Sequence, residues 1–261
     1  MNKNTTTIIP IHPPKYPNGI KLLESFHLYV VSDIWFIFSN QTDYLLFRDL
    51  TTLDFNYLLL SEEYKSYGNI INAKKLFGVE EMFKLGYRYV GVFDSEVEFV
   101  KPFDTNTIYS DIFNSNKFKA NYTNDASHII KECAIAMKLD TNQRLIDLTK
   151  NFSVYWWFND ICVYEKNTFA EFIDWYKKHP NFTILKDGYI YFEYLIYSIW
   201  LICFKNFDVE LLCSNMVFYI GAIETNQNDI VSNIFKSAAD ANKNHKEIEH
   251  IKVLIQIDKN K

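Results

Sequence analysis

The sequence predicts an α/β protein that begins with a doubly wound, mostly parallel sheet. From Thr6 to Phe93, short apolar and β-branched runs alternate with segments of helical periodicity. Hydrophobic residues make up 48% of the 261 residues, which is enough for a large core. With only 7 glycines and 6 prolines the chain has no linker-like stretch, so we expect a single domain spanning residues 1–261.

Each element of the first half has a local signal. The opening run is β-branched and apolar, Asn18 is expected to cap the first helix, and Gly86 is expected to end the second. The expected elements are strands at 6–11, 34–38, 57–60 and 89–93, helices at 18–31 and 70–85, and a polar loop at 39–43. Because ligands gather at the carboxyl ends of parallel strands, the loops beginning at His12, Ser39 and Asp94 should share one mouth.

The second half is less regular. Its expected helices span 104–114, 127–139, 168–178 and 189–204, and its expected strands span 161–164, 209–212, 217–220 and 253–257. From Glu224 the chain becomes polar and rich in Asn and Lys, which fits a surface helix or a partly disordered segment.

Charge and composition exclude several classes of protein. The net charge is -5 and the arginines are few and scattered, so we expect no nucleic-acid partner. The most apolar stretch, 189–204, is shorter than the ~20 residues of a membrane-spanning helix, and Glu193 interrupts it. The N-terminus has no secretory signal and the cysteines have no zinc or C-x-x-C spacing. We therefore expect a cytoplasmic protein without a transmembrane segment.

The strongest chemical signal is the acidic pair Asp94 and Glu96. It directly follows a buried strand, and alternate side chains of an extended backbone share a face. Two carboxylates at a strand end suit Mn²⁺ or Mg²⁺, which share their coordination shell with substrate phosphates. An ordinary acidic turn is the alternative reading of this pair.

The order of these motifs resembles the GT-A class of nucleotide-sugar glycosyltransferases. The resemblance rests on Ile8-Ile9-Pro10-Ile11-His12, on Lys74-Lys75, and on Phe93-Asp94-Ser95-Glu96 in place of the commoner D-x-D. It implies a Rossmann-like half at 1–105 that binds the nucleotide sugar, an acceptor half at 106–223, a polar segment at 224–261, and a mixed sheet.

The resemblance also implies site residues and ligands. Asp94 and Glu96 would hold the metal, and Lys74 is preferred to Lys75 as the residue that assists the donor. Pro10, Ile11 and His12 would line the base pocket, largely through their backbone. The implied donor is a nucleoside diphosphate sugar, with UDP favoured, and the implied acceptor is a glycan or glycolipid.

Acceptor-side candidates lie later in the chain. Trp156 and Trp157 are candidate sugar-stacking platforms, and Asp160 is the candidate base for an acceptor hydroxyl, although this stretch also fits an aromatic corner followed by a turn. Glu193, an acid within an apolar helix, is either a second catalytic candidate or a hydrogen-bonded structural acid.

Two rival functions remain open. A sugar nucleotidyltransferase usually opens with a glycine-rich phosphate loop, but the loop after the first strand has no glycine before Gly19. A carbohydrate-binding or interaction module on a degenerate transferase fold would explain Glu96, and it predicts no metal-dependent affinity for nucleotides.

Overall fold

A computed structural model gives the arrangement of the chain, and it describes residues 4–99, 101–120, 127–149, 161–179, 192–211, 220–225 and 254–259. The central sheet has five strands in the order β3-β2-β1-β4-β7. Its strands are β1 (Thr5–Pro10), β2 (Asp33–Phe38), β3 (Asn56–Leu59), β4 (Tyr89–Val92) and β7 (Cys162–Glu165). The first four are parallel and β7 runs antiparallel to β4, so the α/β class and the mixed sheet are confirmed.

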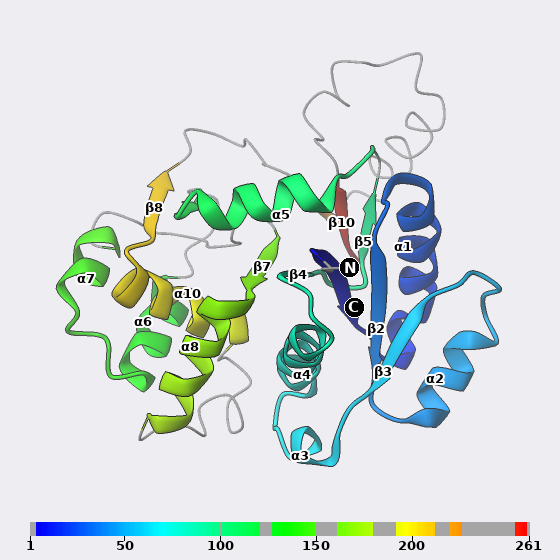
Figure 1. Ribbon diagram of the computed structural model, residues 1–261, viewed down its shortest axis with the longest axis horizontal. Coiled ribbons are helices and arrows are strands. Elements are labelled where there is room, and N and C mark those ends of the chain that lie inside the picture. The colour runs from blue at the N-terminus through cyan, green and yellow to red at the C-terminus, as the bar shows by residue number, and fades with distance from the viewer. Residues whose placement is uncertain are drawn as a thin grey trace.

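Helices cover both faces of this sheet (Figure 1). One face packs against α4 (Ile70–Lys84), which follows the short helix α3 (Glu62–Lys65). The other packs against α1 (Tyr16–Tyr29) and α5 (Thr105–Asn114). Neighbouring residues of β1 serve opposite faces, because Ile8 belongs to the core under α4 and Ile9 to the core under α1.

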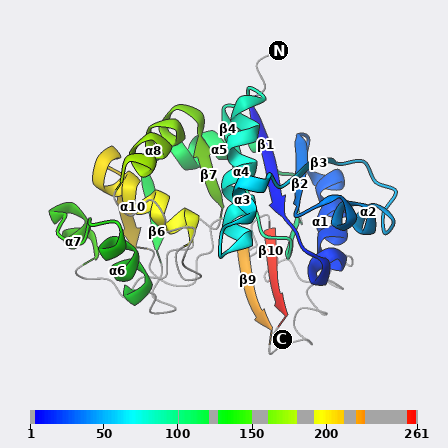
Figure 2. The same cartoon turned by 90° about the horizontal axis from the view of Figure 1, so that it is seen from below.

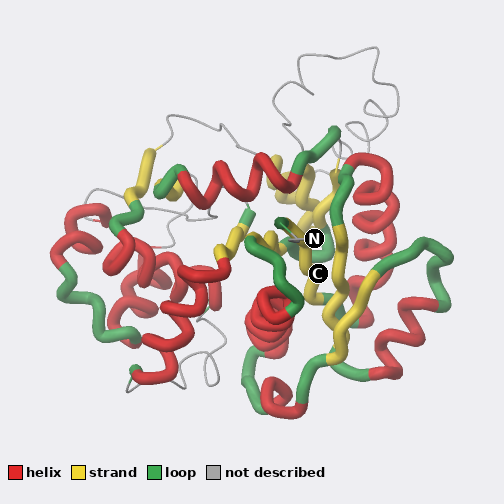
Figure 3. Tube along the Cα trace, viewed as in Figure 1, coloured by secondary structure: helices red, strands yellow, loops and turns green. Residues whose placement is uncertain are grey.

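A group of helices extends the core beyond the β7 edge, as Figure 3 shows on the left. These helices are α6 (Ser127–Ala136), α7 (Gln143–Thr149), α8 (Lys166–Lys178) and α10 (Glu193–Lys205). The most apolar of them, α10, contributes a continuous buried run from Glu193 to Ile202. In the described part of the chain, no helix combines the length and the apolar character that a membrane crossing requires.

Two small sheets complete the fold. Strands β5 (Val97–Phe99), β10 (Leu254–Lys259) and β9 (Ile220–Thr225) form one, and β6 (Lys117–Ala120) and β8 (Asp208–Leu211) form the other. Strands β9 and β10 lie side by side below the central sheet in Figure 2. The polar last segment therefore returns to pair with the residues that directly follow the acidic motif.

The first helix begins earlier than the sequence predicts. Asn18 does not cap it, because a 3-10 turn at Pro13–Lys15 leads straight into α1 at Tyr16, with Pro17 in the first turn. Proline is tolerated there because the first amides of a helix have no intrahelical partner.

The predicted polar loop at 39–43 is the start of a helix instead. The Asn40 side chain accepts a hydrogen bond of 2.9 Å from the amide of Asp43 and caps α2 (Gln41–Arg48). Only Phe47 of this helix is buried, so no apolar stripe marked it in the sequence.

Candidate active site

The carboxyl edge of the central sheet gathers the predicted loops. Strand β1 ends before His12, β2 ends before the Asn40 cap, and β4 ends before Asp94. Because β7 is antiparallel and its Cys162 pairs with Val92, its first residue lies at this same edge. The chain therefore enters β7 beside the acidic motif.

A three-residue charge cluster occupies the end of β4. The ammonium group of Lys75, on α4, lies 3.1 Å from a carboxylate oxygen of Asp94 and 3.7 Å from one of Glu193. Burial disfavours the charge on Lys75, but the two carboxylates outweigh it and raise the pKa of Lys75. Lys75 is thus held between two acids, which favour the charged form of its ammonium group.

Glu193 is the most buried member of this cluster. Its side chain is 1% exposed, and burial raises the pKa of its carboxyl group, which Lys75 opposes. It is the first residue of α10 rather than an interior residue as the sequence suggested, so its charge lies where a helix favours an anion. The structure brings Glu193 and Asp94 to one lysine.

Glu96 has a separate cationic partner. The ammonium group of Lys15 lies 2.5 Å from one carboxylate oxygen of Glu96, and the hydroxyl of Ser95 donates a hydrogen bond of 3.1 Å to the other. The side chain of Lys15 is 29% exposed. Asp94 and Glu96 therefore both follow β4, but the extended backbone predicted for them is wrong, because the Val97 amide donates a hydrogen bond of 3.3 Å to the Asp94 carbonyl and closes a turn. Glu96 pairs with Lys15, and Asp94 shares Lys75 with Glu193.

The two adjacent lysines of α4 do different things. The fully buried Lys74 donates a hydrogen bond of 2.5 Å to the carbonyl oxygen of Ile11, at the end of β1. Burial lowers the pKa of Lys74 to about 8, although Asp43 raises it. Lys74 therefore supports the loop after β1, whereas Lys75 faces the carboxylates.

Among the three residues predicted to line the base pocket, His12 is the one whose side chain could still form a hydrogen bond with a ligand. Pro10 and Ile11 are buried, and the Ile11 backbone already donates to the Ile37 carbonyl and accepts from Lys74. The Nδ1 atom of His12 is buried and has no hydrogen-bond partner among the described residues. Burial and the nearby Lys74 lower the pKa of His12, which Glu96 opposes, so the site favours the neutral form of the imidazole.

The donor set fits a hard divalent cation that retains water and phosphate ligands. Asp94 and Glu96 supply carboxylate oxygens, and their side chains are 31% and 12% exposed. Among the described residues, no group of three His, Cys, Asp or Glu side chains could hold a metal on its own. A cation that binds these two carboxylates would have to displace Lys15 from Glu96 and Lys75 from Asp94.

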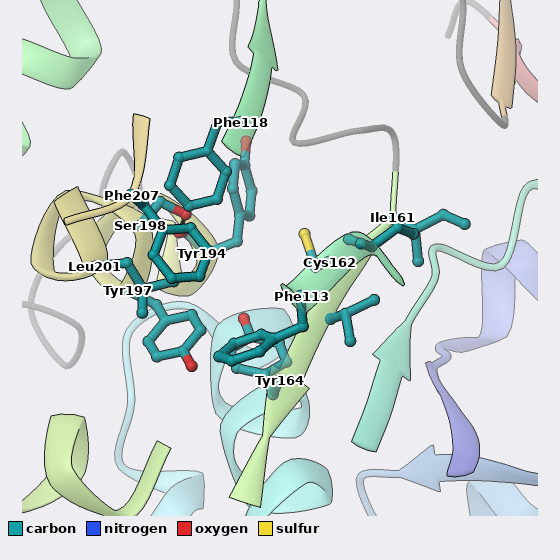
Figure 4. Close-up of a pocket in the computed structure, with 12 residues that line it drawn as sticks. Phe113, Phe118, Ile161, Cys162, Tyr164, Tyr194, Tyr197, Ser198, Leu201 and Phe207 are labelled. Atoms are coloured by element: carbon teal, nitrogen blue, oxygen red, sulfur yellow. Dashed lines mark hydrogen bonds between the residues drawn. The ribbon is translucent and has the colours of Figure 1, made fainter. Parts of the chain in front are cut away.

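A small cavity lies next to this site, between α5, β7 and α10 (Figure 4). Its volume is about 30 Å³, which matches a few water molecules rather than a sugar. The buried hydroxyls of Tyr164 and Tyr197 border it and have no hydrogen-bond partner within the described part of the chain. Most of the other lining residues are apolar, and the cavity is too small to hold a sugar.

The acceptor-side candidates Trp156, Trp157 and Asp160 lie outside the described residues. Sequence reasoning also gave Lys15 no role, although the structure places it on Glu96. Lys15 could have been found from its position directly after His12-Pro13-Pro14, because that loop was already expected at the carboxyl edge of the sheet.

Comparisons with known proteins yield similarity in fold alone. No known family profile matches the sequence, and no curated protein is significantly similar to it. Among solved structures, the chain is similar to 4-diphosphocytidyl-2C-methyl-D-erythritol synthase from Anaerococcus prevotii, with a TM-score of 0.43, 11% identity, and 91% of this chain and 100% of that chain covered.

Two glycosyltransferases are also similar in structure. One is involved in the glycosylation of the major capsid of PBCV-1, with a TM-score of 0.42, 10% identity, and 99% of this chain and 94% of that chain covered. The other is the mannosyltransferase Ktr4p from S. cerevisiae, with a TM-score of 0.40, 10% identity, and 69% of this chain and 62% of that chain covered. At such identities the residues of the site must carry the case for function.

Proposed function

We propose that the chain transfers a glycosyl group from a nucleoside diphosphate sugar to a hydroxyl group of a glycan or glycolipid acceptor. The observation that carries this proposal is the convergence of Asp94, Lys75 and Glu193 at the carboxyl edge of a parallel sheet, where such folds bind nucleotides. Lys15 and Glu96 add a second ion pair to the same edge.

Asp94 and Glu96 are the residues that would hold Mn²⁺ or Mg²⁺. A divalent cation there supplies positive charge to offset the charge on the departing diphosphate. Lys15, whose side chain is 29% exposed, lies beside Glu96 and adds positive charge that can stabilise the same phosphates, whereas the enclosed Lys75 holds Asp94. These charges favour a diphosphate leaving group over a neutral one.

The nucleoside is assigned to the loop after β1. The imidazole of His12 can accept or donate a hydrogen bond through its unpartnered Nδ1, depending on its tautomer. The hydrogen bond from Lys74 to Ile11 fixes the backbone that carries this histidine. We favour a UDP donor among the nucleoside diphosphate sugars, and Lys75 rather than Lys74 as the lysine that positions the metal ligand Asp94.

Proton transfer is assigned to the acceptor side. In an inverting reaction, the acceptor hydroxyl oxygen bonds to the anomeric carbon while the bond to the diphosphate oxygen breaks and the diphosphate takes the electron pair. Asp160, which is close in sequence to the start of β7, would accept the hydroxyl proton. Glu193 is buried against Lys75, so we assign it to the positioning of that lysine.

Donor turnover tests the proposal. The full chain is incubated with UDP-, GDP- and CDP-sugars and Mn²⁺, without acceptor, and the released nucleoside diphosphate is measured, since water can replace an acceptor hydroxyl. We expect release from one class of donor, and loss of that release in Asp94→Ala. If no donor is hydrolysed or bound, the non-catalytic carbohydrate-binding module becomes the better account.

A further inference from the structure

The carboxylate of Glu193 has an unusual environment for a buried acid. Neither of its oxygens has a hydrogen bond of good geometry among the described residues, although the backbone amides of Glu193 and Tyr194 lie close enough to lower its pKa, and its side chain is only 1% exposed. A buried charge without hydrogen bonds is costly unless an opposite charge lies close by. The one counter-charge that the structure shows for it is Lys75, at 3.7 Å, which is already closer to Asp94 at 3.1 Å.

Lys75 has little freedom to leave this pair of acids. Its side chain is 9% exposed, and its ammonium group lies 5.8 Å from the centre of the Tyr194 ring. A lysine at the surface could turn into solvent when a cation takes its partner. Lys75 is enclosed, and Glu193 is the second acid that the described residues place within 4 Å of its ammonium group, so it is the partner at hand when Asp94 is taken.

We propose that Lys75 competes with the divalent cation for Asp94, and that Glu193 receives Lys75 when the cation binds. This inference rests on the proposed function, because it concerns the metal site of that function. Lys75 and Glu193 are positioning residues in this account. The shift is small because the ammonium group already lies within 4 Å of both carboxylates.

Lys15 provides an internal comparison. It pairs with Glu96 as Lys75 pairs with Asp94, but its side chain is 29% exposed, against 9% for Lys75. When a cation binds Glu96, Lys15 can turn into the solvent. Little stability is lost, because an exposed ion pair contributes little. The cost of displacing Lys75 should therefore exceed the cost of displacing Lys15.

The test measures Mn²⁺ binding directly, by the electron paramagnetic resonance signal of free Mn²⁺, on the full chain without nucleotide. The variants are Lys75→Met, Glu193→Gln, the double variant that carries both, and Lys15→Met. We expect Lys75→Met to bind Mn²⁺ about tenfold more tightly than wild type, and Glu193→Gln about tenfold more weakly. The double variant should match Lys75→Met, because Glu193 acts only through Lys75, and Lys15→Met should change the affinity least.

The double variant keeps the test decisive even if a single variant fails to fold, since it removes both buried charges and leaves neither unpaired. If it folds but binds Mn²⁺ no more tightly than wild type, while Asp94→Ala abolishes binding, the exchange is wrong and the metal site stands. If wild type and the double variant both fail to bind Mn²⁺, without nucleotide and also with UDP present against a blank of UDP alone, the exchange and the metal site are both wrong. Binding of nucleoside diphosphates would then be tested separately.

Discussion

The side chain of Lys74 donates a hydrogen bond of 2.5 Å to the carbonyl oxygen of Ile11, and so joins α4 to the loop that follows β1. Lys74 is fully buried under this loop. The next residue of the helix, Lys75, points instead to the carboxylates of the site. One helix thus supports the proposed nucleoside loop and the proposed phosphate site through two consecutive side chains.

Lys74 should give the stability of the protein a measurable pH dependence. Its pKa is about 8 in the folded chain and 10.5 as the ordinary value, so the unfolded chain binds more protons between these limits. The unfolding free energy should therefore rise with pH across this window, by on the order of 1 kcal/mol per pH unit, whereas below about pH 8 the cost of burying the charge is fully present.

Urea unfolding of wild type and Lys74→Met from pH 7.5 to 9.5 checks this expectation. Methionine has a similar length and no charge, so the difference between the two curves isolates the lysine. The wild type should gain stability relative to the variant as the pH rises. Parallel curves would show that Lys74 has an ordinary pKa in the folded chain.

Gly91 should not tolerate a side chain. A β-carbon at Gly91 would lie 2.3 Å from the Tyr109 ring, whose hydroxyl shares a hydrogen bond of 2.7 Å with Thr7. The ring is fully buried and has little room to shift. We expect Gly91→Ala to lower the unfolding free energy by about 1–3 kcal/mol, measured by urea denaturation.

The control for Gly91 is the same substitution in a Tyr109→Ala background. If the clash with the ring is the cause, the cost of Gly91→Ala should largely disappear there. An equal cost in both backgrounds would point to the backbone of β4 instead.

Glu165 should act as the cap of α8. Its carboxylate accepts hydrogen bonds of 2.9 Å from the amide and from the hydroxyl of Thr168, and Glu165 is 7% exposed. Glu165→Ala should therefore lower the thermal midpoint, with a loss of about 1 kcal/mol. Glu171→Ala, on the exposed side of the same helix, is the control and should change the midpoint less. Equal effects would argue against the cap.

The sequence was most informative where one local pattern decides the structure. The buried runs of β1, β2 and β4, and the helix stop at Gly86, which adopts a φ of 96°, follow from apolar patterning and backbone sterics. The antiparallel direction of β7 could not be predicted, because the sequence of a four-residue strand does not indicate which strand it pairs with or in which direction. The same holds for the pairing of β10 with β5.

In the candidate site, too, local sequence patterns were predictable and contacts between distant residues were not. The position of Asp94 after a buried strand was predictable, and Glu193 stood out as an acid in an apolar stretch. That both contact Lys75 depends on the rotation of α4, and neighbouring residues such as Lys74 and Lys75 cannot be separated before that rotation is known. The metal ligands, the donor and the acceptor residues remain predictions.

The most direct test of the central claim is a calorimetric titration of nucleoside diphosphates, with and without Mn²⁺, on wild type, Asp94→Asn and Asp174→Asn. Asp174 is the matched control, because it is also paired with a lysine, Lys178, at 2.7 Å, but on the exposed surface of α8. The account predicts Mn²⁺-dependent binding by wild type and Asp174→Asn, and loss of that binding in Asp94→Asn. Binding that is equally strong in Asp94→Asn, or absent from wild type with every nucleotide, would contradict it.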